Sequence, residues 1–188
     1  MSTHATAPRP VPAALHYAEV AVPGAVIGLV AGAFAAGVAA LAGLPAVQIA
    51  TIATGLGIPL ALLGAGYCAL LAAGRFGVGA VGPVALYWLV GFPLARLLDQ
   101  YTVATVLGYD QILSEPLLSF LAFQAMLSIG FAIGFLWLHE RLAPHLLIRI
   151  QRHNPVAADL VRRYVEQAAA SAKRPASSAG RGRRRDGS

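Results

Sequence analysis

Long apolar stretches separated by short polar segments run through most of the chain. Residues 20–74 contain no Asp, Glu, Lys, Arg or His, and neither do residues 76–95 or 116–138. A helix needs about 20 apolar residues to cross the hydrocarbon core of a bilayer, so the first stretch has room for two spans and a turn. We therefore predict four transmembrane helices, at about residues 20–43, 47–73, 77–98 and 117–138.

The connections between these spans contain residues that are typical of turns. Gly43-Leu44-Pro45 ends the first span and a glycine-rich turn around Arg75 ends the second, so both turns join antiparallel neighbours. The third connection, 97–115, is longer, and its apolar positions predict a short extracytoplasmic interfacial helix that ends at Gly108. Pro116 then opens the fourth span, because proline is tolerated in the first turn of a helix.

Composition agrees with a membrane protein. Hydrophobic residues make up 57% of the 188 residues and charged residues only 12%, whereas soluble domains carry about 25% charged residues. The frequent Ala, Gly and Arg are typical of a GC-rich bacterial genome. The fold class that follows is an all-α integral membrane protein.

Topology follows from the basic residues, which gather in cytoplasmic loops. Arg9, Arg75 and the Arg/Lys-rich C-terminus lie on one side of four spans, and the 97–115 connection on the other side is acidic. Arg96, at the membrane edge, is the exception, and Asp99 three residues on can pair with it. We expect a multi-pass protein of the cell (plasma) membrane with both termini in the cytoplasm.

The segments outside the spans differ in character. Residues 1–19 are expected to be a disordered cytoplasmic N-terminus, and 20–138 the four-helix domain. Residues 139–170 are expected to form a juxtamembrane segment and a cytoplasmic amphipathic helix, opened by Asn154 as the N-cap and Pro155 in the first turn. Residues 171–188 are expected to be a disordered basic tail.

Small residues recur every four positions in the first span, a pattern that predicts close helix packing. A face of this kind lets two helix backbones approach each other in lipid, as in a glycine zipper. The partner is either another span of the same chain or a helix of another copy or subunit. The residues of this predicted packing face are Gly24, Gly28, Gly32, Ala36 and Ala40.

Uncharged polar residues inside the spans are candidates for interhelical hydrogen bonds or for a polar path. Gln48 and Thr51 share one face of the second span, and Gln124 and Ser128 share one face of the fourth. Spans two and three also contain Gly/Pro breaks, which build substrate sites in many transporters. Glycine and proline are also common in membrane helices in general, and we interpret these breaks first as ordinary kinks. No ionisable residue is expected deep in any span, which disfavours ion-coupled transport.

The sequence gives little support for a catalytic site. His139-Glu140 lacks the second histidine three residues on that a helical zinc-protease site requires, and we interpret it as a solvated membrane-edge cluster. Cys68 has no disulfide partner and is expected to pack as a small apolar group. We predict no catalytic, metal-binding or cofactor-binding residue. If the protein were an enzyme, its catalytic residues would have to come from one cluster: Arg96, Asp99 and Tyr101.

The preferred function is a non-catalytic accessory or scaffold subunit of a membrane complex. The alternative is an oligomeric transport or channel module that uses the broken spans two and three. The expected partners are the bilayer with its anionic headgroups and other membrane subunits or further copies, and not nucleic acid. The residues expected to contact lipid or a partner are Arg149, Arg152, Leu160, Arg162, Arg163 and Tyr164.

Overall fold

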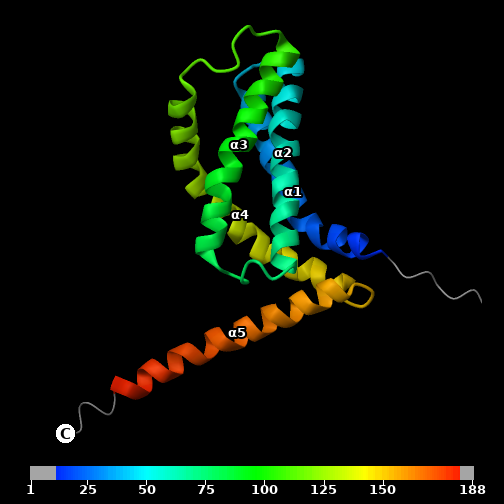
Figure 1. Ribbon diagram of the computed structural model, residues 1–188, viewed down its shortest axis with the longest axis vertical. Helices are drawn as coiled ribbons and strands as arrows, with labels where there is room; N and C mark the ends of the chain where they lie inside the picture. Colours follow the sequence, from blue (N-terminus) through cyan, green and yellow to red (C-terminus); the bar gives the residue numbers. More distant parts are fainter. Residues whose placement is uncertain (1–11, 183–188) are drawn as a thin grey trace, which may run out of the picture.

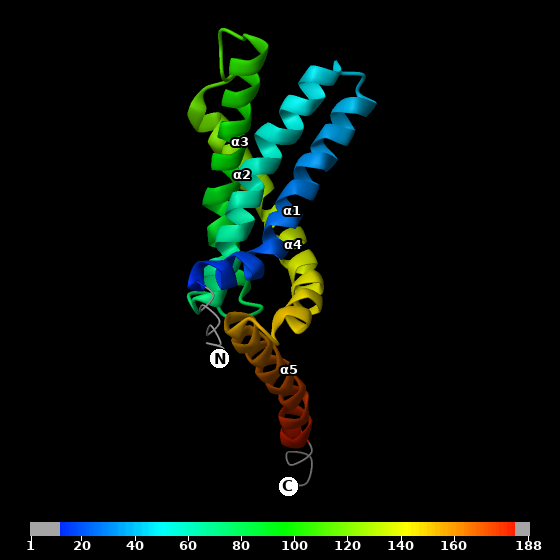
Figure 2. The ribbon, with the colours of Figure 1, turned by 90° about the vertical axis from the view of Figure 1, so that its right-hand side faces the viewer.

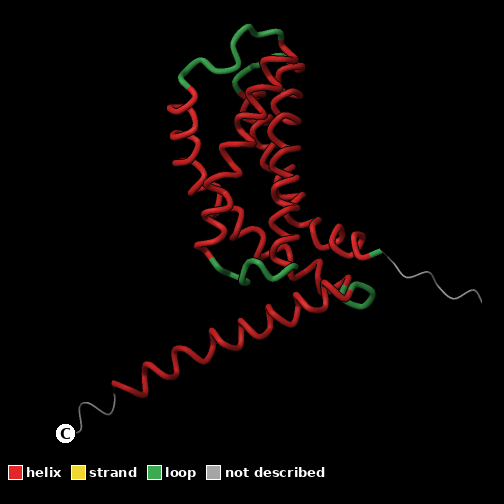
Figure 3. The backbone as a smooth tube through the Cα atoms, viewed as in Figure 1, coloured by secondary structure: helices red, strands yellow, loops and turns green. Residues whose placement is uncertain are grey.

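The computed structural model describes residues 12–182, and over that range the chain forms helices and no strands (Figure 1, Figure 3). The first four helices are long and apolar enough to cross a membrane, which is compatible with a multi-pass membrane protein. The five helices are α1 (Ala13–Leu41), α2 (Ala46–Ala72), α3 (Val81–Leu107), α4 (Leu117–Ile150) and α5 (Pro155–Gly182).

The described helices are longer than the apolar stretches that predict them. α1 begins at Ala13, inside the segment expected to be disordered, and residues 1–11 lie outside the described range. α4 continues from the expected end at residue 138 to Ile150. A helix of 34 residues is about 51 Å long, well beyond the roughly 30 Å of a hydrocarbon core. α4 is therefore long enough to extend beyond a hydrocarbon core into the headgroup layer.

The separate interfacial helix expected within 97–115 is not found. α3 continues without interruption to Leu107, and 109–115 has no helix. The expected end at Gly108 is correct, since this residue adopts the left-handed conformation (φ 73°) that suits glycine at a helix C-terminus. The recurring apolar positions of this segment are thus the last turns of span three.

α1 is bent near its start. Its first turns, in dark blue, run across the base of the bundle before the helix turns upward (Figure 1, Figure 2). Pro23 lies inside α1, and a proline there removes one backbone hydrogen bond and displaces the preceding turn. The bend places the first part of α1 beside the end of α4 and the start of α5.

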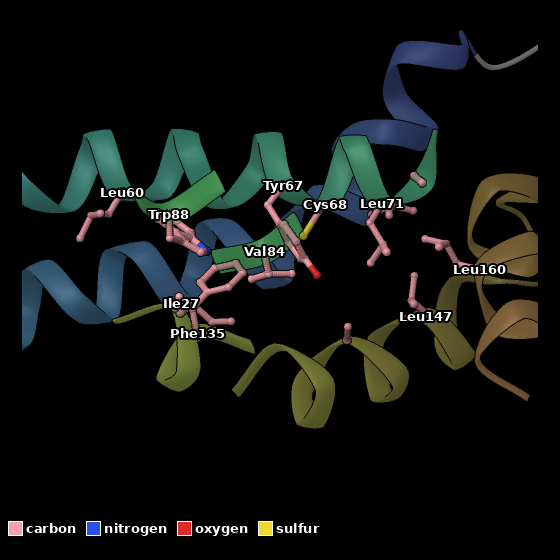
Figure 4. Packing of buried hydrophobic residues seen from close by; sticks show 14 of the residues in the cluster. Ile27, Leu60, Tyr67, Cys68, Leu71, Val84, Trp88, Phe135, Leu147 and Leu160 are labelled. Atoms are coloured by element: carbon pink, nitrogen blue, oxygen red, sulfur yellow. The ribbon is translucent and has the colours of Figure 1, made fainter. Parts of the chain in front are cut away.

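The core lies in the half of the bundle nearer the 73–80 turn. Aromatic side chains from α2, α3 and α4 meet there, with Trp88 packed on Phe131 and Phe135 at ring-centre distances of 4.7 and 4.6 Å. Tyr67 meets the ring of Phe135 edge-on at 5.1 Å (Figure 4). Toward the opposite end, the α1–α2 hairpin diverges from α3 (Figure 2).

α5 leaves the base of the bundle at an oblique angle (Figure 1). Asn154 caps it as predicted, because its Oδ1 accepts a hydrogen bond from the Ala157 backbone N–H at 3.0 Å. The helix continues to Gly182, whereas a disordered tail was expected from residue 171. The alanine-rich run at 167–172 favours helix, and residues 183–188 lie outside the described range.

Candidate functional site

The glycine face of α1 lies directly against the backbone of α2. Gly24, Gly28 and Gly32 are buried, and a Cβ atom at any of them would overlap α2. The overlaps would be with the Gly64 carbonyl, the backbone at 60–61 and the Gly57 Cα. Ala36 is only partly buried and Ala40 is exposed, so the close contact ends before the C-terminus of α1. In this structure the partner of the glycine face is the second span of the same chain.

Two of the four polar residues predicted to bond across helices bond within their own helix instead. The Thr51 hydroxyl donates to the Val47 carbonyl at 2.8 Å, and the Ser128 hydroxyl donates to the Ala125 carbonyl at 2.6 Å. Gln48 is partly buried, and Gln124 is buried with no hydrogen-bond partner for its Oε1 within the described range. A direct bond between helices comes instead from Tyr87, whose hydroxyl donates to the Leu63 carbonyl at 2.6 Å.

A charged pair lies within α3, in the half of the bundle away from the aromatic core. The Arg96 guanidinium pairs with Asp99 Oδ2, and the Asp99 carboxylate is 2% exposed. Its other oxygen, Oδ1, has no hydrogen-bond partner in the part of the chain described and faces Gly55, where a Cβ would lie 3.0 Å away. Asp99 is thus a buried carboxylate within α3, one residue beyond the predicted end of span three at 98.

α3 continues well past Asp99. Asp99 is eight residues from the end of α3 at Leu107, about 12 Å at 1.5 Å per residue, so it lies inside the helix rather than at its edge. Tyr101 is 55% exposed and does not join the pair. Only two of the three residues considered for an enzyme site are thus brought together.

A second pair of buried polar side chains, Cys68 of α2 and His139 of α4, lies between these two helices. Cys68 Sγ and His139 Nε2 are 3.3 Å apart, and both residues are 1% exposed. The His139 ring is stacked on Phe135 at 5.8 Å and meets Tyr67 edge-on at 5.2 Å (Figure 4 shows Tyr67, Cys68 and Phe135). The interpretation of His139 as solvated is wrong, because α4 continues past it and packs against α2 and α5.

The chemistry that the Cys68–His139 pair can support is limited. Within residues 12–182, no three His, Cys, Asp or Glu side chains lie close enough together to hold a metal ion. The thiol and the imidazole are both buried, and the rings of Tyr67 and Phe135 lie beside the imidazole. The pair forms a direct contact between α2 and α4. The sequence offers little signal for it, since the two residues are 71 positions apart.

Side-chain contacts hold the first turns of α5 against the base of the bundle. Leu160 is 1% exposed and points toward Leu71 of α2 and Leu147 of α4 (Figure 4). Arg163 donates to the carbonyl oxygens of Leu71 and Ala72, at 3.1 and 3.3 Å, at the C-terminal end of α2. Unpaired carbonyls at a helix end favour a cation, so this contact fixes α5 against α2.

Tyr164 completes this junction. Its hydroxyl donates to the Glu140 carboxylate of α4 at 3.4 Å, and burial, followed by the Glu140 charge, raises the pKa of Tyr164. Three of the residues predicted to meet lipid or a partner, Leu160, Arg163 and Tyr164, thus contact the chain's own bundle. The exposed members of that set are Arg149, Arg152 and Arg162.

Comparison with protein-family models, with curated proteins and with solved structures found no match.

Proposed function

We propose that this protein is a non-catalytic accessory or scaffold subunit of a membrane complex. In this proposal the four apolar helices anchor it in the cell membrane, and α5 presents a fixed cytoplasmic surface to a partner. The uneven distribution of basic residues supports a cytoplasmic position for both termini.

The observation that carries the proposal is an exposed apolar patch beyond the predicted end of span four. Ile148 of α4 and Val165 of α5 are 56% and 63% exposed, and they line a groove of about 280 Å³ between the two helices. Pro144, Val161 and Ala168 line the same groove. These side chains follow the charge-free stretch 116–138 and are expected at the level of the headgroup layer, where a protein partner would cover them.

The contacts that hold α5 against the bundle support the same proposal. Most helical stability in proteins comes from packing of an apolar face, and the contacts of Leu160, Arg163 and Tyr164 hold the first half of α5 in one orientation. The patch is therefore preformed, and a partner does not have to order it on binding.

Co-purification from a mild detergent tests the proposal. The tagged full-length protein is expected to retain a discrete partner, and Val165→Asp should release that partner, because it puts a charge into the apolar groove. Ala158→Asp is the matched control, since it adds the same charge to an exposed position of α5 that does not line the groove. A full-length protein that purifies without any partner, or one whose partner is lost equally from both variants, contradicts the proposal.

A second candidate function, transport, is favoured by Asp99. A buried carboxylate within a membrane helix is a common feature of ion pathways, and Asp99 Oδ1 has no partner among the described residues. If the protein is a transport module, Asp99→Asn should abolish a cation flux into proteoliposomes. An absence of flux in the wild type would eliminate this candidate.

A further inference from the structure

A groove of about 310 Å³ lies between the first part of α1 and the last turns of α4. Its walls are apolar and its edge is basic, with His145 and Arg149 of α4. The apolar walls are formed by Val22, Pro23 and Val26 of α1 and by Leu142 and Leu146 of α4.

The bend of α1 explains why this groove is open. Pro23 lies in its wall, at the place where the first turns of α1 leave the line of the helix. Val22, Val26 and Leu142 are 44%, 42% and 41% exposed, so the two helices do not close over these side chains. The groove also lies where the apolar stretches of span one and span four give way to charged residues. One end is therefore expected to be in hydrocarbon and the other at the headgroup layer.

The positive charge at the groove's edge is not neutralised by the helices that form it. Arg149 has no ion pair or hydrogen bond from its side chain in the described structure. Within the described parts of α1 and α4, each helix carries one carboxylate, and both are engaged elsewhere. Glu19 accepts hydrogen bonds from Asn154 and His153, and Glu140 accepts one from Tyr164.

We propose that this groove binds one anionic phospholipid. An acyl chain would cover the apolar side chains of α1 and α4, and the phosphate would pair with Arg149 beside His145. Charge complementarity selects this occupant, because a basic edge next to apolar walls matches a lipid with a negative headgroup. A hydrocarbon chain alone, or the apolar helix of another protein, would leave Arg149 unpaired. This inference is independent of the proposed scaffold function.

Native mass spectrometry on the full-length protein tests the site. The protein is reconstituted in nanodiscs of equimolar phosphatidylglycerol and phosphatidylcholine and then released into detergent, and the retained lipids are counted. The wild type should retain one phosphatidylglycerol in preference to phosphatidylcholine. Arg149→Gln should reduce that retention about fivefold, which corresponds to about 1 kcal/mol for one cation near a lipid surface.

Two further variants make the result specific. Arg152→Gln, three residues on and also exposed, should change retention less than about twofold, because Arg152 does not line the groove. Val26→Trp should fill the groove and lower the retention of both lipids. Equal retention of the two lipids by the wild type overturns the proposal. An equal loss from Arg149→Gln and Arg152→Gln also overturns it, because the attraction would then be diffuse surface charge.

Discussion

Asn154 links the turn between α4 and α5 to Glu19 of α1, 135 residues away in the sequence. Its Nδ2 donates to Glu19 Oε2 at 2.8 Å and to the His16 carbonyl at 2.9 Å. Its Oδ1 accepts from the Ala157 N–H and caps α5. One buried amide thus holds the first helix and the last helix together at the base of the bundle.

This link predicts a rescue experiment. Asn154→Asp keeps the capping oxygen but removes the donor and places a second carboxylate beside Glu19. We expect a measurable loss in the free energy of unfolding, since a hydrogen bond to a charged group is replaced by repulsion between two carboxylates. Adding Glu19→Gln restores an amide–carboxylate pair with the roles reversed, so the double variant should recover most of the loss. Thermal unfolding in detergent measures both.

Independent effects of the two substitutions would contradict the link. If Asn154→Asp with Glu19→Gln is no more stable than Asn154→Asp alone, the two side chains do not interact. Asn154→Ala provides a further comparison, because it loses both the cap and the link and should be at least as unstable as Asn154→Asp.

The packing of α1 on α2 predicts different outcomes for two glycines of the same helix. Gly28→Ala places a methyl group into the α2 backbone at 60–61 and should cost about 1–3 kcal/mol. Gly37→Ala has no atom within 4 Å of its new Cβ and should be neutral or slightly stabilising, because alanine favours helix. Thermal unfolding separates the two, and equal effects would mean that the glycine face has no packing role.

Much of the fold follows from local patterns in the sequence. The gaps between charged residues identify four spans, and Asn154-Pro155 identifies the start of α5, because each signal is contained in a few neighbouring residues. The ends of the helices are predicted less well. Hydropathy records where apolar residues stop, whereas α3 and α4 continue as far as backbone hydrogen bonding allows, to Leu107 and Ile150.

The side-chain contacts could not be predicted in the same way. His139 is next to charged residues in the sequence, but Tyr67, Cys68 and Phe135 surround it in space. The amphipathic pattern of α5 shows that its apolar face needs a surface without showing which one. Only the tertiary structure reveals that Leu160 packs on the chain's own α2 and α4.

The buried thiol predicts a reactivity change. Cys68 is 1% exposed and packed against His139, so a maleimide should not react with it in the folded protein and should react after unfolding in denaturant. His139→Ala removes the imidazole and leaves a cavity next to the thiol, so labelling should become faster while the protein is still folded. Rapid labelling of the folded wild type would show that Cys68 is not sealed.

The orientation predicted from the basic residues is tested by cysteine labelling in intact cells. On a Cys68→Ala background, Asp110→Cys should react with a membrane-impermeant maleimide from outside the cell, because it lies in the 108–116 connection at the far end of the bundle from α5 (Figure 1). Ser178→Cys in α5 should react only after the cells are permeabilised. Labelling of Ser178→Cys in intact cells would reverse the proposed orientation.

The proposed partner surface depends on the attachment of α5 to the bundle. Hydrogen exchange of the detergent-solubilised full-length protein tests it most directly. Residues 156–165 should exchange at least about tenfold more slowly than the non-helical 109–115 connection, a difference of about 1.4 kcal/mol in opening free energy. Leu160→Asp with Tyr164→Asp should remove that protection. Exchange of 156–165 in the wild type as fast as that of 109–115 would show that α5 is not docked on the bundle.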